Sequence, residues 1–160
     1  MSEAIINSAD LIVRPAPFDP EKFLGKSWGI IAEERDARSA ALPEVDFGQA
    51  EFISCLKPGE SSIKGEEKLR RLKASGRLRY GASVFHGLWQ DYQNRQENSV
   101  LETLYRLKNL TYLDFFGDVL LSPDGGRLVL CLYRSSGGEW YWDARWLRGD
   151  WPGEVSAVAS

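Results

Sequence analysis

Hydrophobic side chains recur at helical spacing in two stretches near the middle of the chain. In ASVFHGLWQDYQ, residues 82–93, they form one face of a helix. In SVLETLYRLKN, residues 99–109, Ser99 and Glu102 have the spacing of a capping box, in which each side chain caps a backbone N–H group at the start of a helix. We therefore predict two amphipathic helices, each of which needs an apolar surface to pack on.

Two further helices are predicted from signals at their ends. The stretch GEEKLRRLKASG, residues 65–76, begins with two glutamates and ends at a glycine. Its apolar stripe holds only Leu69 and Leu72, so we expect this helix to lie on the surface. A shorter helix is predicted in FDPEKFLG, where Asp19 suits the N-cap and Pro20 suits the first turn.

From residue 111 onwards, the apolar period changes from that of a helix to that of a strand. The stretch TYLDFFGDVLLSPDGGRLVLCLYRSSGGEWYWDARWL predicts four antiparallel strands separated by Gly-containing turns, or three if residues 111–121 form one bent strand. Gly117–Asp118 is short enough for a two-residue hairpin. Residues 128–133 are apolar on both faces, so we expect a central strand there.

The predicted fold is α+β, with a C-terminal antiparallel β-meander of three to four strands and two or three helices packed on one face. An N-terminal strand pair, WGIIAEE and EFISCL, is expected at its edge. A chain of 160 residues suits one domain. We expect residues 1–17 to form an N-terminal arm, residues 18–151 to form the single α+β domain, and residues 152–160 to form a C-terminal tail.

Three tryptophans in EWYWDARW, at 140, 142 and 146, would share one face of a strand with Ala144. We expect this stripe to belong to the core beneath the helices, because each buried tryptophan removes a large apolar area from water. The alternative is an aromatic platform for a sugar, a base or a partner's side chain. Trp151 lies outside the pattern and keeps that alternative open.

Composition limits the classes of function. The net charge is −3 and the sequence pI is near 5.3, so the chain as a whole is not a polyanion binder. The first residues lack the basic region of a signal peptide, and the longest fully apolar run is far shorter than the ~20 residues of a membrane helix. We therefore expect a cytoplasmic protein without a membrane segment.

Signs of catalytic chemistry are few. Cys55 and Cys131 lack the spacing of a zinc site, and both lie in apolar runs, where a thiol behaves as a small hydrophobe. His86 is the single histidine, beside an apolar helix face, so a packing role is favoured over a general base. No phosphate-binding or hydrolase motif occurs, and we predict no cofactor and no metal. The candidates for a carboxylate-based enzyme site are Glu33, Glu34, Asp36, Asp114, Asp118 and Asp143.

The strongest charge feature is a basic cluster in residues 64–79, where seven Lys or Arg and two Glu give a local charge of +5. We predict a non-catalytic interaction or regulatory protein that docks there on an acidic protein surface. A nucleic-acid partner contacted through its phosphates is the alternative, and an enzyme is the third hypothesis. A plain solvated helix face would also explain the cluster. The predicted partner-binding residues are Lys68, Arg70, Arg71, Lys73, Arg77, Arg79 and Trp151.

The stretches LKPGESSIKGEEKLRRLKASGRLRYGASVF and TYLDFFGDVLLSPDGGRLVLCLY, followed by WYW, resemble a set of small bacterial proteins. Those proteins share an LK-x-GE … GEEKL-x-RLK stretch and a C-terminal FFDG-type hairpin. The resemblance covers roughly residues 24–151 and implies a bacterial source, but it implies no activity and no functional residue. Gly117–Asp118 replaces the Asp-Gly of the shared hairpin, which leaves the turn type open.

Overall fold

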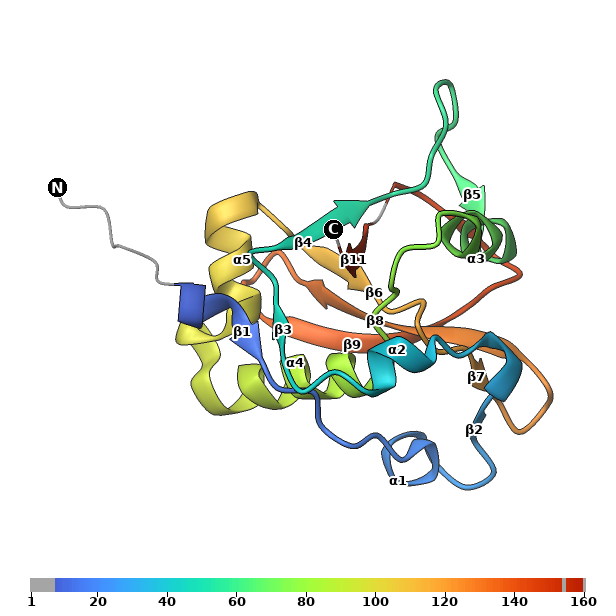
Figure 1. The fold of residues 1–160 in the computed structure, drawn as a ribbon, viewed down its shortest axis with the longest axis horizontal. Helices are drawn as coiled ribbons and strands as arrows, with labels where there is room; N and C mark the ends of the chain where they lie inside the picture. Colours follow the sequence, from blue (N-terminus) through green and yellow to red (C-terminus); the bar gives the residue numbers. More distant parts are fainter. Residues whose placement is uncertain (1–7, 154, 160) are drawn as a thin grey trace, which may run out of the picture.

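The chain folds around one seven-stranded mixed sheet in the computed structural model, which describes residues 8–153 and 155–159 (Figure 1). The strands of this sheet are β2 (Gly29–Ile30), β4 (Ala50–Ile53), β6 (Tyr112–Asp114), β7 (Leu120–Leu121), β8 (Arg127–Arg134), β9 (Trp140–Trp146) and β11 (Ser156–Ala159). Two small antiparallel ladders join β1 (Ile12–Val13) to β3 (Val45–Asp46), and β5 (Ile63–Lys64) to β10 (Asp150–Trp151). The helices are α1 (Pro20–Leu24), α2 (Ala37–Ala40), α3 (Gly65–Ala74), α4 (Ala82–Arg95) and α5 (Val100–Lys108). The predicted α+β class is confirmed.

The predicted caps hold the helix ends. The backbone N–H of Glu21 donates to the Asp19 carboxylate over 3.0 Å at the start of α1. At the start of α5, Ser99 Oγ accepts the N–H of Glu102, and the helix ends at Asn109 in the left-handed region, with φ 54°. These local signals explain why the boundaries of the helices could be read from the sequence.

The central strand is β8, as predicted, but its neighbours differ from a simple meander. It pairs with β9 along one edge, and both β6 and β7 pair with its other edge. Strands β6 and β7 run in the same direction along that edge, as the alternative of one bent strand requires, but residues 115–119 separate them. The predicted hairpin at Gly117–Asp118 is wrong. The reason is tertiary, because the N–H of Gly117 donates to the carbonyl of Tyr80 and a Cβ at Gly117 would collide with the carbonyl of Arg79.

Two segments that were expected to be peripheral form strands. Strand β11 comes from residues 152–160, where a tail was expected, and it pairs in parallel with β6 and antiparallel with β4. Near the N-terminus, Ile12–Val13 pairs with β3, whereas residues 1–7 of the expected arm lie outside the described residues. The prediction of a simple C-terminal meander is therefore wrong, since seven strands from both halves of the chain build the sheet.

Helices cover both faces of the sheet, not one as predicted. On one face, α4 and α5 pack against Leu128, Leu130 and Leu132 of β8. On the other face, Leu69 and Leu72 of α3 pack against a second cluster that includes Val129, Leu147 and Val158. Alternate residues of β8 therefore belong to two different cores, which explains why this strand is apolar on both faces.

The tryptophan stripe of β9 changes from core to surface along the strand. Trp140 is 2% exposed, Trp142 is half-buried with its ring centroid 4.7 Å from that of Phe23, and Trp146 is 36% exposed. Trp151 is 1% exposed, so it is a core residue. None of the described helices is long and apolar enough to cross a membrane.

Candidate functional site

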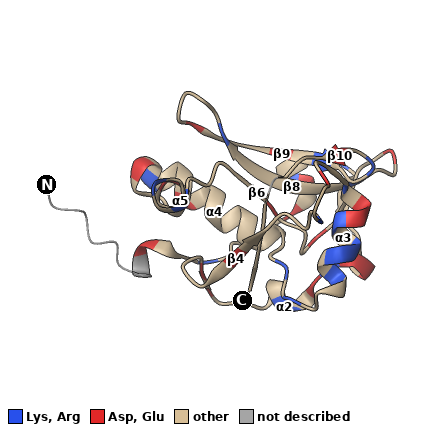
Figure 2. Cartoon of the chain, turned by 90° about the horizontal axis from the view of Figure 1, so that it is seen from above, with Lys and Arg blue, Asp and Glu red and all other residues tan. Residues whose placement is uncertain are grey.

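The basic cluster lies on α3 and on the loop that follows it. The N-terminus of α3 is tied to the end of the sheet, because the N–H groups of Gly65 and Glu66 donate to the carbonyls of Gly149 and Leu147. At the other end, Ser75 Oγ donates to the carbonyl of Leu72, and Gly76 turns the chain with φ 71°. Figure 2 shows basic and acidic residues alternating along this helix.

Lys68 lies inside the protein and not on its surface. Its side chain is fully buried, and Nζ lies 2.7 Å from Asp114 Oδ2 of β6. The ammonium group also lies 5.4 Å from the ring centroid of Phe116 and 5.7 Å from the ring of Trp151. Asp114 also accepts a hydrogen bond from Ser156 Oγ of β11. This ion pair therefore joins α3 to two strands of the sheet and is not accessible to a partner.

Arg79 is also buried, and it binds Asp36 and Phe116 inside the protein. It is 8% exposed, and its guanidinium donates to the carbonyl of Phe116 over 2.6 Å. Its backbone N–H donates to Asp36 Oδ2 over 2.9 Å. Burial lowers the pKa of Arg79, and the neighbouring carboxylates of Asp36 and Glu34 oppose that shift. Three of the seven predicted partner-binding residues, Lys68, Arg79 and Trp151, are therefore buried.

The four remaining cations are ion-paired. Arg71 is the most tightly held, because its guanidinium bonds both oxygens of Glu60, at 2.7 and 3.0 Å, and the carbonyl of Cys55 at 2.8 Å. The hydrogen bonds from Arg71 lower the pKa of Glu60 to about 2. The other pairs are Arg70 with Glu67, Lys73 with Glu34, and Arg77 with Glu51.

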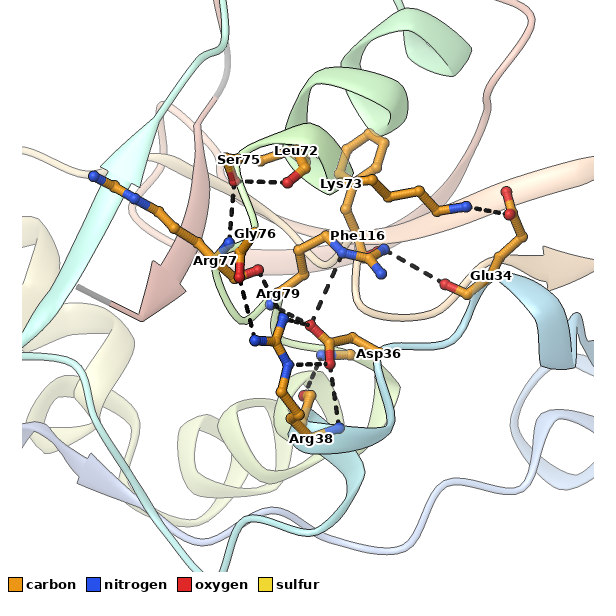
Figure 3. Close-up of polar contacts among 12 residues, drawn as sticks. Glu34, Asp36, Arg38, Leu72, Lys73, Ser75, Gly76, Arg77, Arg79 and Phe116 are labelled. Carbon is orange, nitrogen blue, oxygen red and sulfur yellow. Dashed lines mark hydrogen bonds and ion pairs between the residues drawn. The ribbon is translucent and has the colours of Figure 1, made fainter.

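Acidic residues from the segment before α2 complete the cluster (Figure 3). Glu34 accepts hydrogen bonds from Lys73 and, over 2.5 Å, from Arg127 of β8. Asp36 accepts two hydrogen bonds from the Arg38 guanidinium, at 2.9 and 3.0 Å, besides the N–H of Arg79. Burial acts to raise the pKa of Asp36, but these donors outweigh it and hold that pKa below its usual value. The positive charge of the cluster is thus largely balanced by carboxylates from distant parts of the chain.

Four of the six carboxylates considered for an enzyme site bind cations or backbone N–H groups of the chain itself. Glu34 forms an ion pair with Lys73, Asp36 with Arg38, and Asp114 with Lys68. Asp118 bonds Arg35 at 2.8 Å and accepts the N–H of Ala82 at the start of α4. Burial raises the pKa of Asp118. Within residues 8–153 and 155–159, no group of three or more His, Cys, Asp or Glu could hold a metal ion.

The three other candidate groups have packing environments. His86 Nδ1 lies 2.7 Å from the carbonyl of Pro17, and the imidazole meets the rings of Phe18 and Phe23 edge-on at centroid distances of 5.9 and 5.5 Å. Cys131 is fully buried, and burial raises the pKa of its thiol to about 12. Burial also raises the pKa of Cys55. Reactive cysteines have a lowered pKa, so neither thiol has the environment of a nucleophile.

No family model, no curated protein and no solved structure matches the chain. The resemblance to small bacterial proteins stays a prediction.

The acidic partners of the cluster were not predicted from the sequence. Glu51, Glu60 and Asp114 are 26, 11 and 46 residues from the cations that they bind. The one usable signal is Asp114 in TYLDFF, a charged residue between strand residues that are apolar. A charge at such a position is rarely buried unless it is paired, so a buried cation could have been expected.

Proposed function

We propose that this protein is a small non-catalytic interaction protein that docks on a macromolecular partner through the outer side of α3 and the loop after it. We define this surface, the α3 face, as Arg70, Lys73 and Arg77 with their acidic neighbours Glu67 and Glu51. The observation that supports it is exposure: 64% of the Arg70 side chain, 38% of Lys73 and 39% of Arg77 remain accessible. These three cations can reach a partner, unlike Lys68 and Arg79.

The energetics of exposed ion pairs favour such a role. A surface pair contributes only about 0–1 kcal/mol to folding, so Arg70 or Arg77 can exchange its internal carboxylate for a partner's group at little cost to stability. Complementary charges across an interface raise the association rate and select the partner. Arginine is also enriched among residues that dominate binding energy.

The alternating signs favour a protein partner over nucleic acid. Glu67 and Glu51 lie beside the cations that a phosphate backbone would contact, and both would repel it. A protein surface can present basic groups to these glutamates and acidic groups to the cations. Nucleic acid is therefore an outcome that the test must separate from the proposal.

The test compares two triple variants with equal changes in charge. One carries Arg70→Glu, Lys73→Glu and Arg77→Glu, and the control carries Lys22→Glu, Lys26→Glu and Lys108→Glu at exposed positions outside the α3 face. Each protein captures partners from lysate of the source cells, with and without nuclease, and circular dichroism checks that each is folded.

We expect one partner protein that survives nuclease, is retained by the control and is lost by the α3-face variant. Purified, that partner should bind with the same ranking of variants. If the captured signal disappears with nuclease and weakens steeply between about 50 and 200 mM salt, the α3 face binds nucleic acid and not a protein. Equal capture by both variants would refute the proposal.

A further inference from the structure

A groove of about 580 Å³ lies between the end of α5, the start of β6 and strand β4 (Figure 1). It opens where the sheet is incomplete, because β6 and β11 pair at a single position, Asp114 with Ser156, and β11 does not extend back to Tyr112. A groove of this volume can hold a small organic molecule. Its described lining includes Phe52, Lys108, Leu110, Thr111, Tyr112 and Val155.

The groove has an apolar wall and a polar wall. Phe52, Leu110 and Val155 form the apolar wall, and all three also pack against the core beneath α4 and α5. The polar wall is the connection from α5 to β6, where the exposed residues Lys108 and Thr111 lie. A ligand that matches both walls needs an apolar body and a polar or charged group.

Lys108 gives this groove a positive charge. Its Nζ lies 5.6 Å from the ring centroid of Phe52, so the ammonium group reaches from α5 to the apolar wall. Among the described residues, Lys108 has no ion-pair partner and no Asp or Glu lines the groove. In contrast, a groove of about 340 Å³ beside α4 has Glu97, Glu102 and Glu139 in its wall. The charge at Lys108 therefore matches an anion.

A carboxylate fits this site better than a phosphate. Phosphate groups are commonly bound at a helix N-terminus or by arginine. Lys108 is the one Lys or Arg in the described lining, and it lies at the C-terminal end of α5, where the helix dipole is negative. We propose that the groove binds a small organic acid, whose carboxylate contacts Lys108 Nζ and whose apolar body lies along Phe52, Leu110 and Val155.

Three acids with apolar bodies of different shape serve as probes: phenylbutanoate, indolepropanoate and octanoate. NMR chemical shifts of the isotope-labelled protein, titrated at constant pH and ionic strength, report where each acid binds. We expect at least one acid to shift the backbone amides of Tyr112 and Val155, with a dissociation constant of about 1 mM or below. The primary amide of the same acid has a similar shape without the charge, and it should bind about fivefold more weakly.

Variants of Lys108 separate the effect of charge from that of shape. Lys108→Gln should weaken binding of the acid about fivefold and leave binding of the neutral amide unchanged. Lys108→Arg should keep the preference for the acid, because it keeps the positive charge. Lys26→Gln removes a charge at an exposed position that does not line the groove, and it should change the binding of neither compound.

Thr111→Trp tests the groove itself. Thr111 is an exposed residue of the lining, so an indole at this position should fill the groove and abolish binding. The circular dichroism spectrum should stay that of the wild type. Leu121→Trp introduces the same side chain at an exposed position of β7 that does not line the groove, and it should leave the binding of the acid unchanged.

Three outcomes would overturn the proposal. The first is that none of the three acids, at about 10 mM, shifts the amides of Tyr112 and Val155. The second is equal binding of an acid and its amide to the wild type. The third is a peptide with a C-terminal phenylalanine carboxylate that binds this groove more than about tenfold more tightly than any of the acids, which would make it a site for the end of a protein chain. None of these outcomes bears on the α3 face, which uses other residues.

Discussion

The two faces of the sheet are built on different principles, although β8 contributes to both. Beneath α4 and α5, the residues of β8 that point inward are leucines, among them Leu130 and Leu132, in a cluster of hydrophobic side chains. Beneath α3, the apolar cluster surrounds the buried pair of Lys68 and Asp114. An apolar face accepts many packings of similar volume, whereas a buried ion pair accepts one geometry. We infer that the pair fixes the position of α3, and with it the α3 face.

The largest effect is expected from breaking the pair. Lys68→Met should lower the free energy of unfolding by about 3–5 kcal/mol, because it leaves the Asp114 carboxylate buried without its cation. Adding Asp114→Leu should restore most of the loss, because neither charge of the pair then remains buried. Urea denaturation of the two single variants and the double variant measures the coupling. Additive losses would show that the two charges do not depend on each other.

The apolar face should respond to volume alone. Leu130→Met, which introduces the same residue as the Lys68 variant, should lower the free energy of unfolding by less than about 1.5 kcal/mol. Leu130→Ala should lower it by about 2–4 kcal/mol, because the cavity cannot fully collapse. Equal losses for Leu130→Met and Lys68→Met in urea denaturation would contradict the comparison of the two faces.

The Asp36 carboxylate, which binds Arg38 and the N–H of Arg79, should stabilise the fold only when it is ionised. Asp36→Asn should lower stability by about 1–2 kcal/mol at neutral pH, since its hydrogen bonds come from charged and backbone donors. The pKa of folded Asp36 lies below its usual 3.8, so the carboxylate's contribution is complete above 3.8 and is lost as the pH falls through the folded-state pKa. Urea denaturation from neutral pH to below 3.8 should show the variant and the wild type converging. A difference in stability that stays constant over this pH range would contradict the prediction.

The smallest changes in stability are expected at the exposed aromatic residues on each face of β9. Trp146 is 36% exposed on the side of α4 and α5. Tyr141 is 42% exposed on the side of α3, with its ring centroid 5.8 Å from that of Tyr133. Trp146→Ala and Tyr141→Ala should each lower the free energy of unfolding by about 1 kcal/mol or less. Thermal unfolding of dilute protein is the measurement. If either variant lowers the free energy of unfolding by more than about 3 kcal/mol, the replaced residue belongs to a core, contrary to the prediction.

The elements that could be predicted are those with a long local pattern. Helices α4 and α5 carry an apolar stripe and a capping box, and β8 is apolar on both faces. Strand β11 could not be predicted, because the four residues SAVA are too short to show a period and they follow Pro152 and Gly153, which favour a turn. The class of the fold was therefore predictable, but the order of its strands was not.

The candidate site shows the same limit. Lys68 lies four residues before Leu72 and one before Leu69, on the inward side of α3, yet in a run of basic residues its charge predicts exposure. Its buried partner, Asp114, lies 46 residues away, so no local pattern contains the pair. Arg70 and Arg77 were correctly placed at the surface. The partner of Arg70, Glu67, lies three residues before it on the same helix, but the partner of Arg77, Glu51, comes from a pairing that no local pattern contains.

The parallel pairing of β11 with β6 has a consequence for how the protein folds. Both neighbours of β11 in the sheet, β4 and β6, precede it in the chain, so the sheet stays incomplete until Ser156–Ala159 have been synthesised. Before then, the edges of β4 and β6 that β11 will join are unpaired on the nascent chain, and such edges promote aggregation. Contacts between residues this distant in sequence also slow folding. We therefore expect the rate of folding to be limited by the insertion of β11 between β4 and β6.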